Sequence, residues 1–477
     1  MLKDHRGFPY IPNSEPSVKT AMLEFIGAQN EMDLYEEIPE HIRFRGKLNL
    51  PEPIRDEYNL KRHTEKILSK NRNCSQYLNF IGAGCAQHFV PAVCDEIIGR
   101  GEFLTSYGAE GWADHGKHMA FFEFQSQLAE LLDMDFITVP VYDGAQAIGT
   151  GLCMSNRING RKKVLLPANM DPQNLAIVTN YLASVRPENA LQIELINYNN
   201  ETGLLDIEDL QNKIGPDVAA VLLQNPNYFG LVEGSADIIG QITREVGAEY
   251  LVYTDPISLG VMEAPANYGA TITVGDIHTL GLHLSGGAGV GGFVATFDDM
   301  KYMEQTKDLV DGITATSVEG EYGFGMVLIE RTHYARREKG NEFTGTGVNL
   351  WAINSAVYMA LMGPKGFEEV GQTIMQNSQY AAKKLAAIQG VEIKFTNPFF
   401  KEFVVNFDKT DKKAAEVIAD LLQEEIFAGK DISGEFPHLG QNLLVCVTEV
   451  HDKADIDRFT AAIAKSIGSQ EQKGVSK

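Results

Sequence analysis

Several features that would assign this chain to a class at once are missing from it. Its five cysteines form no CxxC pair and show no regular spacing, which favours free thiols in a reducing compartment over zinc sites or disulfides. No run of 18 apolar residues suggests a membrane span, and the start, Met1–His5, has no apolar core of a secretory signal. The net charge of −23 argues against nucleic acid or an anionic membrane as a partner, because phosphate binding needs clustered Lys and Arg. We therefore expect a cytoplasmic protein.

Common catalytic motifs are also missing. The chain has no G-x-x-x-x-G-K-[ST] phosphate loop and no G-x-S-x-G serine elbow. Gly287–Gly292 matches G-x-G-x-x-G, but strand-like Phe293–Phe297 follows it instead of a helix, so a glycine turn between strand-like segments is favoured over a dinucleotide site. His115 and His118 could share a helix face, yet no H-E-x-x-H spacing occurs, and we expect no metal.

What is present is an alternating pattern typical of an α/β protein. Strands are expected at 164–166, 193–196, 218–223 and 250–253, with helices at 174–183, 207–214 and 236–246 between them. Short apolar runs that alternate with amphipathic helices predict a mostly parallel sheet covered on both faces, with ligands at the carboxyl ends of the strands.

The pattern also predicts a domain organisation. Residues 1–75 are expected to form an N-terminal arm laid against the body or a partner, and residues 76–358 the large α/β domain. Residues 359–467 are expected to form a smaller α+β domain with an alternating, one-sided sheet. Its helices are expected at 377–388, 414–425 and 456–463, and its strands at 403–407 and 443–447. Residues 468–477 are polar and predict a flexible tail.

Lysine is absent between Lys213 and Lys301, in a stretch that otherwise reads as a binding site for pyridoxal phosphate (PLP). The stretch holds Asp255 at the end of an apolar strand, then Gly275–His278 and His283–Gly287. A PLP enzyme needs an amine here to form its Schiff base. Asp255 could pair with the pyridinium nitrogen of PLP, although Asp-Pro commonly caps a turn and the spacing alone favours that role.

A charge-dense run lies further along the chain, from Glu330 to Lys339. Its arginines, Arg336 and Arg337 among them, would be carboxylate or phosphate clamps in a functional interpretation. A solvated helical face with i, i+3 and i, i+4 pairs is the simpler interpretation, and the sequence favours it.

The whole chain resembles the alpha subunit of the two-subunit glycine cleavage system P-protein, a PLP-dependent glycine decarboxylase. The resemblance runs almost from end to end and depends on motifs in the same order: Tyr10-Ile11-Pro12, Met22-Leu23, Phe80-Ile81-Gly82-Ala83-Gly84, His88, Pro91, Glu123-Phe124-Gln125, Tyr142-Asp143-Gly144-Ala145, Gln224–Gly230, Asp255–Gly260, Arg336–Lys339, Lys401-Glu402-Phe403 and Thr448-Glu449-Val450.

The resemblance implies an aminotransferase-like fold of PLP fold type I, in which the beta subunit carries the Schiff-base lysine in a His-Lys pair. By the register of the motifs, His283 stands at that histidine and Leu284 at that lysine. This chain would then hold no covalent PLP and would complete an α2β2 complex whose beta subunit binds the cofactor covalently. That complex removes CO2 from glycine, its small amino-acid substrate, and passes the aminomethyl group to the lipoyl arm of the H-protein. The resemblance marks these residues as possible contributors to a vestigial site or an interface: Tyr107, Tyr142, Asp143, Asp255, His278, His283, His333, Arg336 and Arg337.

The chain departs from the family pattern in clusters, at Ser106–Trp112, Gly286-Gly287-Ala288, Arg331–Ala335 and Gly340–Gly347. This clustering suggests a divergent paralogue, whose substrate could be another amino acid and whose carrier could be another protein. Two further hypotheses stay open: a complete PLP enzyme that recruits Lys301 or Lys339, and a non-catalytic binding or regulatory protein with the same fold.

Overall fold

The structure, a computed structural model, describes residues 11–104, 115–138, 140–183, 187–286, 290–306, 310–342 and 347–468. The chain divides into two compact units, Met1–Arg72 and Asn73–Lys477.

The first unit is helical, and its described residues form no buried core. It contains α1 (Pro16–Ile26), α2 (Glu57–Leu68) and the 3-10 helices η1 (Pro12–Ser14), η2 (Glu31–Tyr35) and η3 (Glu40–Ile42). Side chains cap its helices: Glu15 accepts from the first amides of α1, and Asp56 from the amide of Asn59 in α2. None of its described residues is buried, and Phe25 is 92% exposed.

The second unit is built around a seven-stranded sheet with the order β2-β8-β7-β6-β5-β3-β4. The strands are β2 (Phe136–Ile137), β3 (Lys163–Pro167), β4 (Gln192–Ile196), β5 (Val218–Gln224), β6 (Glu249–Thr254), β7 (Ile272–Asp276) and β8 (Gly292–Thr296). The five strands from β7 to β4 are parallel, and β8 runs antiparallel to both of its neighbours, β7 and β2. The expected mostly parallel sheet is therefore confirmed, and each element predicted between 164 and 253 is present within two residues at either end.

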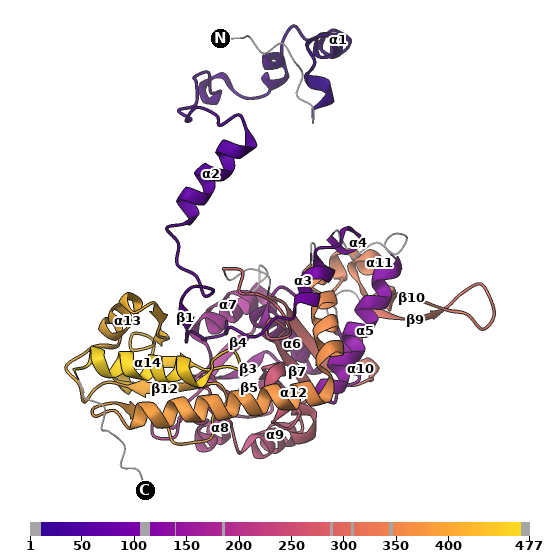
Figure 1. Ribbon diagram of the computed structural model, residues 1–477. Helices are drawn as coiled ribbons and strands as arrows, with labels where there is room; N and C mark the ends of the chain where they lie inside the picture. Colours follow the sequence, from indigo (N-terminus) through magenta and orange to yellow (C-terminus); the bar gives the residue numbers. More distant parts are fainter. Residues whose placement is uncertain are drawn as a thin grey trace. The chain divides into compact units, whose positions relative to one another are not determined.

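Helices cover both faces of this sheet, because successive side chains of its strands point to opposite sides. On one face Leu222, Leu251 and Val274 pack against α6 (Gly144–Asn159) and α7 (Pro172–Ala183). On the other face Leu223 and Val252 belong to a core shared with α5 (His115–Leu132), α8 (Ile207–Lys213), α9 (Ala236–Glu245) and α12 (Asn349–Ala386). Figure 1 shows α7 and α9 on opposite sides of the strands.

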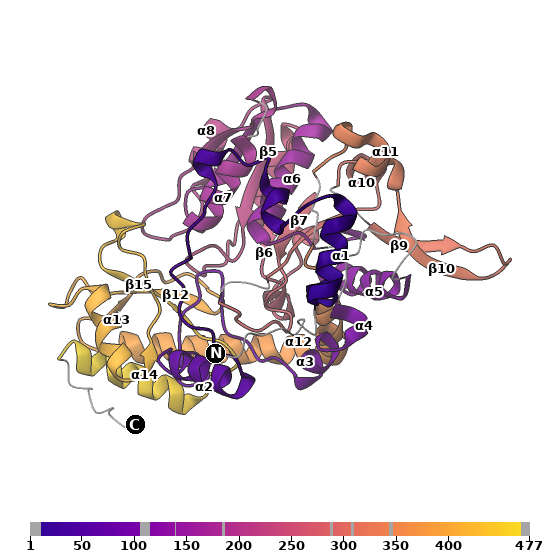
Figure 2. The same ribbon diagram turned by 90° about the horizontal axis from the view of Figure 1, so that it is seen from above.

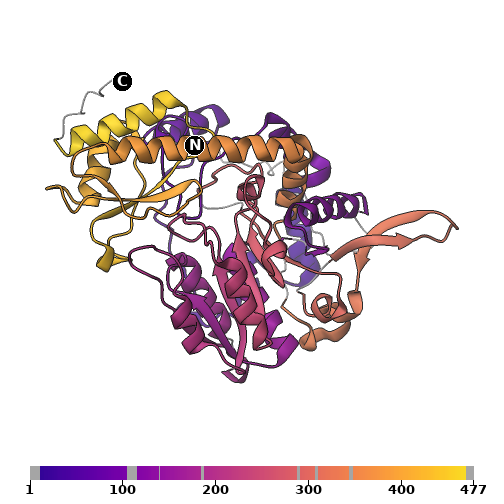
Figure 3. The same cartoon turned by 90° about the horizontal axis from the view of Figure 1, so that it is seen from below.

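The C-terminal part has an antiparallel sheet with the order β11-β12-β15-β14. Its elements are β11 (Glu392–Ile393), β12 (Glu402–Asn406), α13 (Ala414–Gln423), β13 (Ile426–Phe427), β14 (Lys430–Asp431), β15 (Asn442–Cys446) and α14 (Lys453–Ser466), and Figure 3 shows α14 beside the long α12. The expected one-sided burial is wrong, since all five residues of β15 are buried. The core there also takes in Phe80, Tyr228 and Phe229 from earlier in the chain.

Two segments cross the predicted domain limits. The helix α12 passes through residue 358, and β1 (Leu78–Asn79) pairs in parallel with β13 near the other end of the chain. The division at 75, 358 and 467 stays a prediction.

An antiparallel hairpin of β9 (Val310–Ala315) and β10 (Tyr322–Val327) projects from the sheet (Figures 1 and 3). Its base is held to α5 by the buried pair His118–Asp311 and by ring contact between Phe122 and Phe324.

The remaining short helices are α3 (Ala92–Ile98), α4 (Gly101–Leu104), α10 (Met300–Met303) and α11 (His333–Arg336), with the 3-10 helices η4 (Pro187–Asn189), η5 (Pro256–Gly260), η6 (Pro265–Tyr268), η7 (Ile329–Arg331), η8 (Arg337–Lys339) and η9 (Pro437–Leu439). None of the helices seen in the described ranges has the length and apolar content to cross a bilayer.

Candidate functional site

The candidate site lies at the carboxyl ends of β6 and β7, where an open parallel sheet places its ligands. Asp255 follows β6 directly, and Asp276 is the last residue of β7. Asp255 also caps η5, because its Oδ1 accepts a hydrogen bond from the backbone N–H of Ile257 at 3.2 Å. Asp255 therefore caps η5 and also takes part in an ion pair.

Asp255 forms an ion pair with Lys401. The two atoms Nζ of Lys401 and Oδ2 of Asp255 lie 2.5 Å apart, and the side chains are only 10% and 17% exposed. The hydroxyl of Thr279 donates to the other oxygen, Oδ1, at 3.0 Å. Lys401 comes from the segment that leads into β12, so the ion pair joins the C-terminal sheet to the large sheet.

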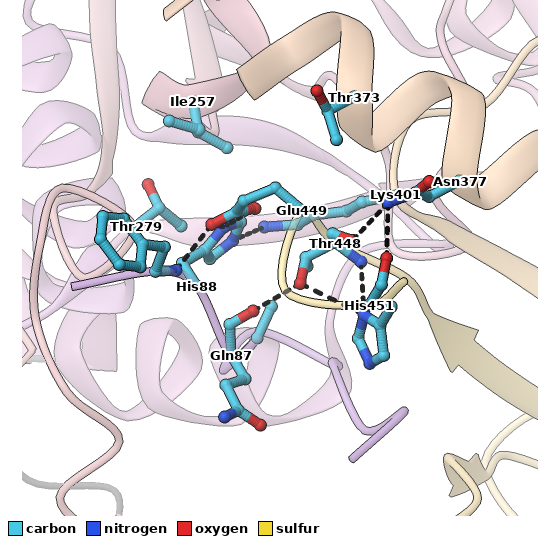
Figure 4. Close-up of polar contacts among 12 residues, drawn as sticks. Gln87, His88, Ile257, Thr279, Thr373, Asn377, Lys401, Thr448, Glu449 and His451 are labelled. Atoms are coloured by element: carbon cyan, nitrogen blue, oxygen red, sulfur yellow. Dashed lines mark hydrogen bonds and ion pairs between the residues drawn. The ribbon is translucent and has the colours of Figure 1, made fainter. Parts of the chain in front are cut away.

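Two further residues extend this ion pair into a network (Figure 4). The ammonium of Lys401 donates to Nε2 of His88 at 3.3 Å, and Nδ1 of His88 faces Glu449 at 2.9 Å. An ammonium has no lone pair to give, so Nε2 must accept and Nδ1 must carry the proton that His88 donates to Glu449. The loop that carries His88 is itself held by the hydroxyl of Thr448, which donates to the carbonyl of Gln87 at 2.7 Å.

The charges of the network support one another. Burial alone would raise the pKa of Asp255, but Lys401, His88 and the hydrogen bond from Thr279 together outweigh it and hold that pKa below its ordinary value. Burial alone would lower the pKa of Lys401, but Asp255, with smaller contributions from Cys446 and Glu402, raises it well above the ordinary value. In the same way His88 and the amide of Phe89 overcome burial and lower the pKa of Glu449. Asp255, Lys401 and Glu449 are therefore all ionised at neutral pH.

Asp276 and His278 lie beside the network but without a cation of their own. Burial raises the pKa of Asp276 to about 7, although the backbone N–H of His278 donates to it at 2.7 Å. Burial and the Lys401 ammonium lower the pKa of His278 to about 4, so this imidazole is neutral. Its Nε2 lies 2.8 Å from the carbonyl oxygen of Ala86 and donates to it.

The N-terminus of α6 faces the same edge of the sheet. Asp143 caps it, with Oδ1 accepting from the backbone N–H of Gln146 at 2.7 Å. Asp276 accepts from the backbone N–H of Gly144. Two of the amides that would attract a phosphate at this helix N-terminus, those of Gly144 and Gln146, are thus already bonded to carboxylates of the chain.

The space left at the site is small. A cavity of about 60 Å³ lies beside Lys401, lined among others by Asp171, Gln224, Asn227 and Tyr228. A cavity that holds benzene measures about 150 Å³, and PLP adds a phosphate ester, an aldehyde, a hydroxyl and a methyl group to a ring of that size. Lys401 occupies the cation position at Asp255, and carboxylates occupy the helix end. This cleft does not fit PLP.

Comparisons with known proteins assign the chain to a family. The model of the glycine cleavage system P-protein family matches residues 9–463. The chain belongs to the glycine cleavage system P-protein family. It is 40% identical over 467 residues to the probable glycine dehydrogenase (decarboxylating) subunit 1 of Staphylothermus marinus, covering 96% of this chain and 98% of that relative.

Solved structures agree with this assignment. The crystal structure of glycine decarboxylase (P-protein) in inhibitor-bound form superposes with a TM-score of 0.85 at 28% identity, over 96% of this chain and 100% of the other. C-DES, solved as a mutant with glycine covalently linked to its PLP cofactor, has a TM-score of 0.58 at 20% identity over 84% of this chain and 98% of the other, and shares the fold alone. The P-protein chain thus has PLP fold type I, as the sequence predicted.

The structure brings some of the predicted site residues together. Asp255 and His278 both line the cavity, and Asp143 lies at the helix end beside Asp276. Tyr142, the residue before that cap, is 44% exposed. Tyr107 lies outside the described residues. The roles assigned to these residues stay predictions.

The residues at the expected lysine position are not part of the cavity lining. Leu284 is half-buried, and His283 is exposed and pairs with the equally exposed Asp95 at 3.0 Å. Residues 287–289 of the turn expected at Gly287–Gly292 lie outside the described residues; the strand expected after that turn is β8.

The remaining predicted residues lie after the β9–β10 hairpin. His333 and Arg336 bound the four-residue α11, and the chain turns at Arg337 with a positive φ of 52°. Arg336 and Arg337 are exposed, on two short helices instead of the one helical face that the charge pattern favoured.

The sequence reasoning missed Lys401, His88 and Glu449 as site residues, although each lies in a motif of the family resemblance. Lys401 and Glu402 interrupt an apolar run from Phe399 to Val405, and charged residues inside such a run are a signal for buried ions. The two lysines considered instead lie elsewhere: Lys301 pairs with Glu249, and Lys339 is exposed in η8.

Proposed function

We propose that this chain is the alpha-type subunit of a PLP-dependent glycine decarboxylase, and that a lysine-bearing beta partner holds the cofactor. The Lys401–Asp255 ion pair supports this most strongly, because it takes the position a pyridinium nitrogen would need. The absence of lysine between Lys213 and Lys301 agrees with it.

In the assembled enzyme, PLP supplies the electron sink that lets glycine lose CO2. The aminomethyl group then passes to the lipoyl arm of the H-protein. This chain completes the assembly, an α2β2 complex, and does not bind PLP covalently. By itself it is inactive.

The test is reconstitution of glycine–bicarbonate carboxyl exchange from separately purified subunits with PLP and a lipoylated H-protein. We expect no exchange from this chain alone, and exchange when the beta partner is added. The matched control is a beta partner with its Schiff-base lysine replaced by alanine, which should remain inactive with this chain. Exchange by this chain alone, or none with an authentic beta partner, would overturn the proposal.

The same assay with alanine and serine in place of glycine addresses substrate choice. Exchange with one of these and not with glycine would indicate a paralogous subunit that acts on another amino acid.

A further inference from the structure

Asp255 poses an electrostatic problem for a chain that does not hold PLP. Its carboxylate is largely buried at the end of β6, and an ionised carboxylate without a counter-ion is costly in such a position. In a PLP enzyme of this fold the pyridinium nitrogen of the cofactor is the counter-ion. This chain needs another cation at the same place.

Lys401 meets that need, and the surrounding backbone is shaped to bring it there. The residue adopts a positive φ of 51°, which is strained for a side chain other than glycine. Its carbonyl accepts from the amide of Val447 at 2.8 Å, and Phe400 before it and Phe403 two residues after it are buried. Gly230 lets the chain approach closely here, because a Cβ on it would lie 1.9 Å from the carbonyl oxygen of Glu402.

The position of Lys401 differs from that of a Schiff-base lysine. In a PLP enzyme of this fold, an aspartate at the place of Asp255 would pair with the ring nitrogen, whereas the imine would form at the aldehyde on the opposite side of the pyridine ring. The ammonium of Lys401 is also kept protonated by Asp255, and a protonated amine is not a nucleophile. Lys401 therefore has the position and the charge of a counter-ion.

We propose that Lys401 is a resident substitute for the cofactor cation, whose ammonium neutralises Asp255, joins the two sheets and keeps this chain's own cleft closed. His88 and Glu449 orient the ammonium from the other side. This inference concerns the chain's own cleft and holds whichever partner supplies PLP, so its test needs neither the partner nor turnover.

Chemical rescue separates this role from ordinary packing. Lys401→Ala removes Cγ, Cδ, Cε and Nζ, and propylammonium has the same three carbons and nitrogen. We expect the melting temperature of the full-length variant to fall by roughly 5 °C and to rise again, saturably, with propylammonium chloride. Tetramethylammonium chloride at equal concentration has the charge but no N–H donor, and should not restore it.

The matched control is Lys465→Ala, which removes a lysine that is 73% exposed and paired with Glu424 on the surface. Propylammonium should leave the melting temperatures of this variant and of the wild type unchanged. An equal response of both alanine variants would overturn the proposal, as would saturable PLP binding by the wild-type chain.

A second pair of variants keeps the test decisive if Lys401→Ala does not fold. Lys401→Met keeps the stem and removes the charge, so it should lower the melting temperature. Adding Asp255→Asn should recover much of the loss, because no unpaired buried charge remains. A Lys401→Met chain as stable as the wild type, or no recovery in the double variant, would contradict the proposed counter-ion.

Discussion

Two aspartates at the same edge of the sheet, Asp255 and Asp276, have pKa values that are shifted in opposite directions. Lys401, His88 and Thr279 together overcome the effect of burial on Asp255 and keep its pKa low, whereas no cation of the described residues pairs with Asp276, whose pKa rises to about 7. Asp143, at the nearby helix end, adds to the rise. Different neighbours therefore separate the pKa values of two buried carboxylates of the same sheet.

The raised pKa of Asp276 predicts a pH dependence of stability. Its pKa is about 7 in the folded chain, against 3.8 for the ordinary group, so the folded state binds more protons between these values. The free energy of unfolding should then fall as pH rises from about 4 to 7, by at most about 1.4 kcal/mol per pH unit from this group. Asp276→Asn cannot ionise and should lose this slope.

Urea unfolding at pH 5, 6, 7 and 8 measures the slope for the wild type and the variant. Asp411→Asn, in an exposed loop, is the control and should keep the wild-type slope. Parallel slopes for the wild type and Asp276→Asn would contradict the assigned shift.

The sequence could predict Asp255 but not its partner. An aspartate after an apolar strand is a local pattern, and it pointed to both a capping role and a charged role. Lys401 is far along the chain from Asp255 and is 313 residues from His88, which it also contacts. Nothing local connects three such residues, so only the packing of the two sheets brings them together.

The long helix α12 shows what limits prediction at the scale of an element. The sequence pattern indicated a helix only at 377–388, whereas α12 spans Asn349–Ala386 with non-helical geometry at Gly363 and Pro364 after it. A glycine and a proline inside a helix break the apolar periodicity that prediction depends on. Strands β3, β5 and β6 of the large sheet were predicted closely because each contains a short apolar run, whereas β2 and β7 were not predicted.

The break in α12 predicts the effect of a substitution. Gly363 has φ 57° and ψ −179°, a region that is essentially open only to glycine. No other atom lies within 4 Å of the place where a Cβ would stand, so any cost of Gly363→Ala comes from the backbone. We expect the free energy of unfolding to fall by about 1–3 kcal/mol, measured by urea unfolding.

Gly116→Ala is the control for this substitution. Gly116 lies in α5 with open space around its Cβ position and no positive φ. Alanine there should stabilise the chain by about 0.5–1 kcal/mol. If both substitutions changed the free energy of unfolding equally, the backbone at residue 363 would accept a side chain without strain, and the prediction would be wrong.

At the scale of the whole molecule, the two units differ in how they are stabilised. None of the described residues in the unit that ends at Arg72 is buried. In the other unit, the first hydrophobic core residue along the chain is Phe80, and the partly buried Leu78 packs against the same core. Phe80 stacks on the ring of Phe459 at 3.9 Å between centroids, and β1 pairs with β13. The larger unit therefore has its own cores, and the segment from β1 onward contributes residues to them.

Two truncations test this division. A chain that starts at residue 73 should keep the cooperative thermal unfolding and nearly the melting temperature of the full chain, as measured by calorimetry. A chain that starts at residue 83 loses β1 and Phe80 and should be destabilised by at least about 3–5 kcal/mol, the typical cost of removing a buried phenylalanine. Equal destabilisation by both truncations would contradict the division.

The sequence by itself determined that this P-protein chain has an alternating α/β architecture and no lysine between Lys213 and Lys301. Both are properties of the covalent chain: periodicity sets which faces can be buried, and folding cannot supply an amine that a residue does not carry. Only the tertiary structure decided which cation lies beside Asp255. The contact of Lys401 with Asp255 depends on how the C-terminal sheet packs against the large sheet, and no local pattern encodes a contact across that distance.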